Sequence, residues 1–144
     1  MSIKLTWDDL LIQNLPPVEV RTWLAEWTWL VSGDVSPVFM TKFGSWFLRR
    51  RDGSIEFLNV LEGTLTTVAT SEQEFLAMVN RQDWQEENLL SLMIFHLHEE
   101  GKIPGPTECY AFAPHPLLTG KIAQDQVMIL GIHVWQSICS QTCR

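Results

Sequence analysis

The segment from Gly105 to Gly120, GPTECYAFAPHPLLTG, carries the side chains best suited to chemistry. Cys109 precedes Tyr110, the only tyrosine of the chain, and His115 follows between two prolines. A cysteine becomes a nucleophile when a base lies within hydrogen-bond reach and the thiol pKa is lowered. These residue types raise the hypothesis of a small thiol-dependent enzyme that uses Cys109 and His115.

The same segment also fits a structural role. Residues 108–112, ECYAF, alternate as a strand does, so that Cys109 and Ala111 face one way and Tyr110 and Phe112 the other. A buried cysteine in such a run usually packs as a small apolar residue. Because only the residue types favour catalysis, we expect this segment to be architecture and the protein not to be an enzyme.

Metal binding has two candidate sites in the sequence. His96 and His98 lie two positions apart, and on a helix their side chains would point about 200° apart, so they cannot share a metal ion. His96 and Glu100 could chelate from one helix face, but zinc normally needs three or four protein ligands. Cys139 and Cys143 are also four apart and lack further ligands. We therefore expect no metal and no cofactor.

Composition restricts the function classes further. The 144 residues, of which 46% are hydrophobic and 19% charged, fit one domain spanning residues 1–144. A net charge of -7 disfavours nucleic acid and anionic lipid as partners and favours a basic protein. No apolar run approaches the roughly 18 residues of a membrane span. The odd count of three cysteines and the absence of a signal-like start favour a cytoplasmic location.

A change of hydrophobic period marks a predicted sheet. Residues 45–51 and 54–60 read as strands, and the Asp52-Gly53 pair between them predicts a hairpin with a type I′ turn. A second turn at residues 61–63 leads into a third strand at residues 64–69. The sequence therefore predicts a three-strand antiparallel meander.

Helices are predicted before and after this meander in the sequence. Their expected ranges are residues 6–14 with Thr6 as cap, 17–31, 70–80 with overlapping capping boxes, 83–101 with Asp83 as cap, and 133–141. Residues 125–132 read as a further, buried strand. This order predicts an α+β fold in which a mainly antiparallel sheet packs against helices.

Two surface features bear on binding. Asp83, Glu86 and Glu87 stand together at one predicted helix start and form a candidate acidic patch for a partner. Seven tryptophans are many for this length, and exposed ones favour binding surfaces, which raises the alternative of a small-ligand-binding sensor domain. The only basic run, Arg49 to Arg51, lies beside a turn and is expected to be solvated.

The order of motifs resembles one bacterial domain family. The stretch TKFGSWFLRRRDGSIEFLNVLEGTLTTVATSEQEFLAMV resembles its middle, and GKIPGPTECYAFAPHPLLTGKIAQDQVMILGIHVWQSI resembles its end. The family is the C-terminal domain of type VI secretion immunity proteins. The matching residues are Phe43, Gly44, Asp52, Gly53, Gly63, Phe75, Gly101, Lys102, Cys109, Tyr110, Phe112, Pro114, Gly120 and His133. Ser45 replaces the family's aspartate, and Thr119 replaces the first glycine of its Gly-Gly pair.

The resemblance implies an immunity protein that protects a bacterium from a toxic effector. Founding members of the family neutralise a DNase, and no catalytic residues are known in it. The expected function is therefore a non-enzymatic protein-binding domain that occludes a cognate toxin in the cytoplasm. Tyr110 and His115 lie in the family's marker segment, so we expect them, with the acidic patch, at the partner-binding surface.

Overall fold

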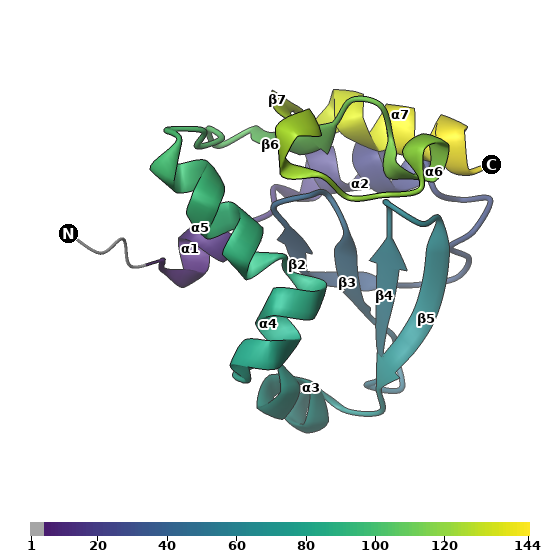
Figure 1. Cartoon of the computed structure of the whole chain (residues 1–144). Helices are drawn as coiled ribbons and strands as arrows, with labels where there is room; N and C mark the ends of the chain where they lie inside the picture. Colours follow the sequence, from purple (N-terminus) through teal and green to yellow (C-terminus); the bar gives the residue numbers. More distant parts are fainter. Residues whose placement is uncertain (1–4) are drawn as a thin grey trace.

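A five-stranded antiparallel sheet runs through the computed structural model, which describes residues 5–144 (Figure 1). Its strands lie side by side in chain order. They are β1 (Leu11–Ile12), β2 (Ser36–Thr41), β3 (Trp46–Arg49), β4 (Ile55–Asn59) and β5 (Thr64–Ala69). The predicted meander is confirmed as β3 to β5. Two further strands were not predicted, because β1 has only two residues and β2 follows neither period clearly.

The turn between β3 and β4 lies at the predicted place but has a different type. Only Gly53 has a positive φ there, at 91°, whereas a type I′ turn needs two such residues. Arg50 N–H bonds to the Ser54 carbonyl, so three residues form the loop. The Asp52 carboxylate accepts hydrogen bonds from the Ser54 N–H and hydroxyl, which fixes Asp52 in its ordinary backbone region.

The N-terminal helices are shorter than predicted. They are α1 (Trp7–Leu10), which the Thr6–Asp9 capping box starts, and α2 (Pro17–Ala25). Residues 26–30 form turns instead of continuing to residue 31. These turns direct the Trp27 indole to Gln136 and the Trp29 indole to Ser140. Hydrogen bonds to a distant helix thus override the helical spacing of apolar residues in this segment.

The predicted helix 83–101 is two helices, α4 (Gln82–Asn88) and α5 (Ser91–Glu99), which lie at an angle to each other (Figure 1). Leu90 breaks it with a left-handed φ of 56°. The run from residue 89 to 95 is apolar except for Ser91, so its periodicity does not show the break. Arg81, not Asp83, is the N-cap of α4, and the Asp83 carboxylate pairs with Arg81. In contrast, α3 (Glu72–Val79) begins as predicted, with Ser71 accepting from the Glu74 N–H.

A second layer of short elements lies over one end of the sheet (Figure 1). It consists of β6 (Glu108–Phe112), α6 (Pro116–Thr119), the 3-10 turn η1 (Gln124–Gln126), β7 (Val127–Gly131) and α7 (Ile132–Cys143). β6 and β7 form a separate antiparallel pair, and α7 packs against α2.

Gln136 of α7 ties this layer to the sheet. Its side-chain oxygen accepts from the indole N–H groups of Trp27 at 2.8 Å and Trp46 at 3.0 Å. Its amide nitrogen donates to the Gly44 carbonyl at 2.7 Å. The side chain is fully buried, so these bonds satisfy polar groups that have no access to water.

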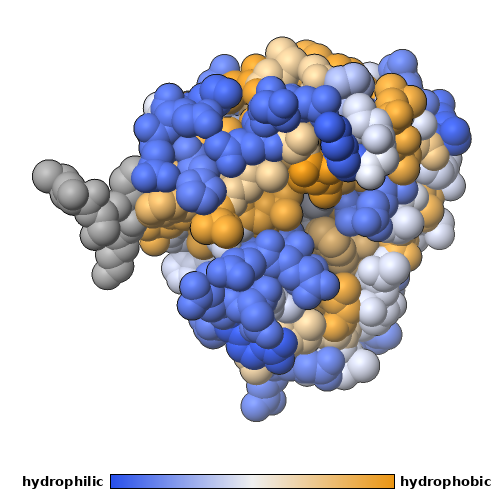
Figure 2. Space-filling view, viewed as in Figure 1, coloured by the Kyte–Doolittle hydropathy of each residue, from blue (hydrophilic) through white to orange (hydrophobic). Residues whose placement is uncertain are grey.

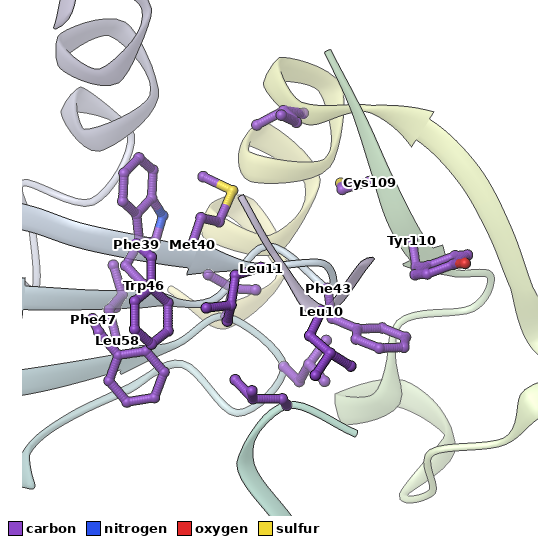
Figure 3. Packing of buried hydrophobic residues seen from close by; sticks show 14 of the residues in the cluster. Leu10, Leu11, Phe39, Met40, Phe43, Trp46, Phe47, Leu58, Cys109 and Tyr110 are labelled. Atoms are coloured by element: carbon purple, nitrogen blue, oxygen red, sulfur yellow. The ribbon is translucent and has the colours of Figure 1, made fainter. Parts of the chain in front are cut away.

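Aromatic and aliphatic side chains from both layers form one core (Figure 3). Phe43, at the turn after β2, lies 5.2 Å from the Tyr110 ring of β6, and Phe47 of β3 lies 5.1 Å from Phe75 of α3. The predicted α+β class is confirmed as a single compact domain. Within residues 5–144, no helix is both long and apolar enough to cross a bilayer.

Candidate binding groove

The Cys109 thiol lies inside the core, away from solvent. Its side chain has no exposed area, and this burial raises the pKa of the thiol to about 12, with a smaller contribution from the charge of Glu108. The nucleophilic thiolate is therefore scarce at neutral pH. Tyr110 and Phe112 are buried on the opposite face of the same strand, so both faces of β6 are covered.

Both ring nitrogens of His115 are engaged in hydrogen bonds. Nδ1 accepts from the Leu117 N–H at 3.1 Å, which leaves Nε2–H to donate to the Val60 carbonyl at 3.0 Å. This is the neutral ring, and burial lowers the pKa of His115 although its bond to Val60 opposes the shift. No lone pair is left to act as a base towards Cys109, so the geometry gives His115 a positioning role.

The structure also places Tyr110 in the interior. Its hydroxyl donates to the Lys102 carbonyl at 2.5 Å, and its side chain has no exposed area. Only 3% of His115 is exposed. The expectation that Tyr110 and His115 contact a partner therefore needs correction, because both side chains stabilise the interior that supports the surface.

The other chemical candidates are not assembled into a site. His96 Nδ1 lies 3.0 Å from a Glu99 oxygen on the same helix, and residues 5–144 contain no group of three side chains that could hold a metal ion. The three arginines pair individually, Arg49 with Glu72, Arg50 with Glu56, and Arg51 with Asp34. Their charges are thus balanced locally.

A groove lies where the open part of the sheet faces α4, the start of α5 and the loop after α6. Figure 2 shows apolar surface in this hollow between two polar regions. One cavity of about 320 Å³ lies over β4 and β5, and a neighbouring one of about 400 Å³ lies beside α6. Both are lined by Leu61, Glu62 and Ile122, so they form one groove. Phe57 and Leu90 line one end of it, and Leu117 lines the other.

The turn from residue 59 to 63 is held rigidly at the middle of this groove. The Asn59 side-chain oxygen accepts from the N–H groups of Leu61 and Glu62, at 3.0 and 3.2 Å. Val60 N–H donates to the Ser45 hydroxyl, and the Val60 carbonyl accepts from His115 and, at 3.6 Å, from the Cys143 thiol. Leu61 and Glu62 are thus presented to the groove by a fixed backbone.

Two carboxylates border the groove, Glu62 on this turn and Glu87 on α4. Both residues are exposed, and neither forms a salt bridge with any residue in the described range 5–144. Glu86 instead lines a different hollow, between α1, α4 and α5, while Asp83 pairs with Arg81. The predicted acidic patch is therefore divided, and only Glu87 of its three members reaches the groove.

The sequence indicated Glu62 only as a turn residue and did not predict its place at a binding groove. The turn was recognised from Leu61, Glu62 and Gly63, but the partners that fix it, Ser45 and His115, lie far away in the chain. The tryptophans do not line the groove. Trp7 lines a separate hollow beside α3, and Trp29 is 41% exposed in the turns that follow α2.

The chain matches no protein-family model, and no curated protein matches it.

Proposed function

We propose that the protein is a non-enzymatic binding domain of the immunity type, which occludes the functional surface of a basic toxin in the cytoplasm. The supporting observation is the groove, whose lining includes apolar side chains and the carboxylates of Glu62 and Glu87, neither of which forms a salt bridge within residues 5–144. The order of motifs that resembles immunity proteins supplies the biological setting. The interior positions of Cys109 and His115 agree with a binding role.

The chemistry of the groove defines the partner surface that it fits. The apolar side chains of its lining would contact an apolar anchor, and Glu62 and Glu87 would each accept hydrogen bonds from arginine or lysine. A nuclease exposes basic side chains where it binds DNA, so it offers this combination. The net charge of -7 would steer the two proteins together before the groove is filled.

The first test is direct association. The chain would be co-expressed with the product of the adjacent gene, and the pair analysed by gel filtration. Co-elution at equal stoichiometry is the expected result, together with loss of the toxin's activity in the complex. Separate elution of every adjacent toxin-like product would count against the proposal.

The second test assigns the binding to the groove. In the double variant Glu62→Lys with Glu87→Lys, we expect affinity for the captured partner to fall by about 2 kcal/mol or more, roughly thirty-fold. The matched control is the double variant Glu19→Lys with Glu26→Lys, which reverses the same number of charges. Glu19 lies on α2 and Glu26 is its C-cap, and neither lines the groove. Equal loss in both double variants would show that net charge, and not the groove, determines affinity.

A further inference from the structure

β7 is an unprotected edge strand. It pairs only with β6, and among the described residues no strand lies on its other side. Its sequence, VMILG, contains no charge and no proline, and Met128 is 41% exposed. Exposed apolar side chains also occur on the following helix, at Val134 and Ile138. Such an edge is a template for pairing with another strand.

The backbone groups on the free side of β7 follow from its pairing with β6. Ile132 N–H donates to the Thr107 carbonyl, and Ala113 N–H donates to the Gln126 carbonyl. In an antiparallel pair these directions alternate, so residues 126, 128, 130 and 132 face β6. Val127, Ile129 and Gly131 therefore direct their N–H and C=O groups to the free edge. Tyr110, opposite Ile129, agrees, since its N–H bonds away from β7 to Lys42.

Two of these six outward groups are already engaged. Val127 N–H bonds to the Gln124 carbonyl, and Gly131 is the N-cap of α7, where the carbonyl accepts the first bond of the helix. The free edge thus offers an acceptor at Val127, a donor and an acceptor at Ile129, and a donor at Gly131.

This pattern is complementary to itself. If a second copy of β7 lies antiparallel with Ile129 opposite Ile129, each Ile129 N–H meets the other Ile129 carbonyl. Each Gly131 N–H then meets the Val127 carbonyl of the second copy. Val127 N–H of one copy lies opposite Gly131 C=O of the other, and both groups are already bonded within their own copy. Every free group on the β7 edge therefore finds a partner in this register.

We propose that two copies of the chain associate through β7 about a two-fold axis. The two small sheets then become one sheet of four strands, β6-β7-β7-β6. A two-stranded sheet is marginal on its own, and the added ladder and apolar contacts stabilise it. Across the axis, Met128 of one copy lies opposite Leu130 of the other, in the closer, non-hydrogen-bonded type of pair.

The other sheet edges carry features that block such pairing. β1 has two residues, and the exposed part of β2 contains Pro37 and a register shift. β5 has a register shift at Val68 and exposed threonines. Short strands, proline and bulges all protect edges, and β7 has none of them. This contrast distinguishes β7 from the edges of the five-stranded sheet.

The test is the mass of the full chain in solution, measured by sedimentation over a range of concentrations. We expect the wild type to reach twice the monomer mass, and Met128→Lys to remain a monomer with an unchanged circular dichroism spectrum. Met128→Leu, the apolar control, should remain a dimer. A wild type that stays monomeric throughout, or a dimer that Met128→Lys leaves intact, would overturn the proposal.

Cysteine pairs test the register of the two β7 strands directly. Copies carrying Met128→Cys, mixed with copies carrying Leu130→Cys, should form a disulfide-linked dimer under mild oxidation, because this pair has the separation that a disulfide needs. Wild type treated alike controls for linkage through the native, partly exposed Cys143. Linkage no greater than in the wild type would contradict the register.

Discussion

His115 connects the interior to the groove through a neutral ring. Its Nε2–H holds the Val60 carbonyl, and the same turn presents Leu61 and Glu62. The sequence indicated the residue types near Cys109 but not their partners, since Val60 lies 55 positions from His115. A cysteine and a histidine close in sequence thus proved to be a core side chain and a positioning residue. Gln136 went unrecognised for a similar reason, because its two tryptophan partners lie 109 and 90 positions away.

The buried neutral ring predicts a pH dependence of stability. Burial holds the pKa of His115 below its ordinary value of 6.5, so below 6.5 the unfolded chain binds a proton that the folded chain resists. This contribution to stability is fully present above 6.5 and is lost as pH falls towards the lowered pKa. We expect denaturant unfolding to show a smaller acid-induced loss of stability in His115→Gln than in the wild type.

The control for this prediction is His133→Gln, which changes an exposed histidine of α7. The acid-induced loss of stability in His115→Gln is compared with the loss in this variant. If His115→Gln loses stability as steeply as the wild type between neutral pH and the acid side of 6.5, then His115 is not the group responsible.

At the scale of elements, the sequence predicted what local chemistry determines. The Ser71 N-cap of α3, the position of the turn at Gly53 and the strands of the meander were predicted, because each depends on residues a few positions apart. The break at Leu90 and the end of α2 at Ala25 were not. They depend on which neighbours cover the apolar side chains of each segment, and the local sequence does not carry that information.

Two glycine turns of the meander allow a matched test of close packing. Gly53 and Gly63 both have positive φ, 91° and 72°, so alanine at either site costs about 1–2 kcal/mol in backbone energy. A Cβ at Gly53 would meet nothing within 4 Å, whereas at Gly63 it would lie 2.6 Å from the Cys143 Cβ. Overpacking of this kind typically adds about 1–3 kcal/mol.

We therefore expect Gly63→Ala to lower the free energy of unfolding more than Gly53→Ala, as measured by denaturant titration. Gly63→Ala should also weaken binding of the captured partner, because the turn that it disturbs carries Glu62. Equal destabilisation by the two substitutions would mean that α7 moves away from the turn at little cost.

At the scale of the whole molecule, the groove combines pieces that are distant in the chain. β4, β5, α4 and the loop after α6 each contribute side chains, and the layer above the sheet positions them through His115 and Gln136. The sequence predicted the fold class and the acidic character of the surface. It did not predict the groove, because no segment contains it. The β7 edge shares no lining residue with the groove, so the two surfaces are built from different residues.

The charge of the whole chain predicts how binding responds to salt. A chain of net charge -7 attracts a basic partner over a distance that salt shortens, to about 8 Å at physiological ionic strength. The association rate of the wild type should therefore fall steeply as salt is added. Reversing Glu62 and Glu87 changes the net charge to -3, since each substitution adds two positive charges, and should flatten this dependence.

Stopped-flow measurement of association across ionic strength separates the local from the global effect. The variant with Glu19 and Glu26 reversed has the same net charge of -3, with its new positive charges on α2 and its C-cap. If the groove receives the basic surface, the groove variant should lose more of the salt dependence than this control, because charges close to the contact dominate a screened interaction. Identical salt dependence of the association rate in both variants would mean that the net charge of the molecule, and not the groove, attracts the partner. The binding surface would then lie outside the groove.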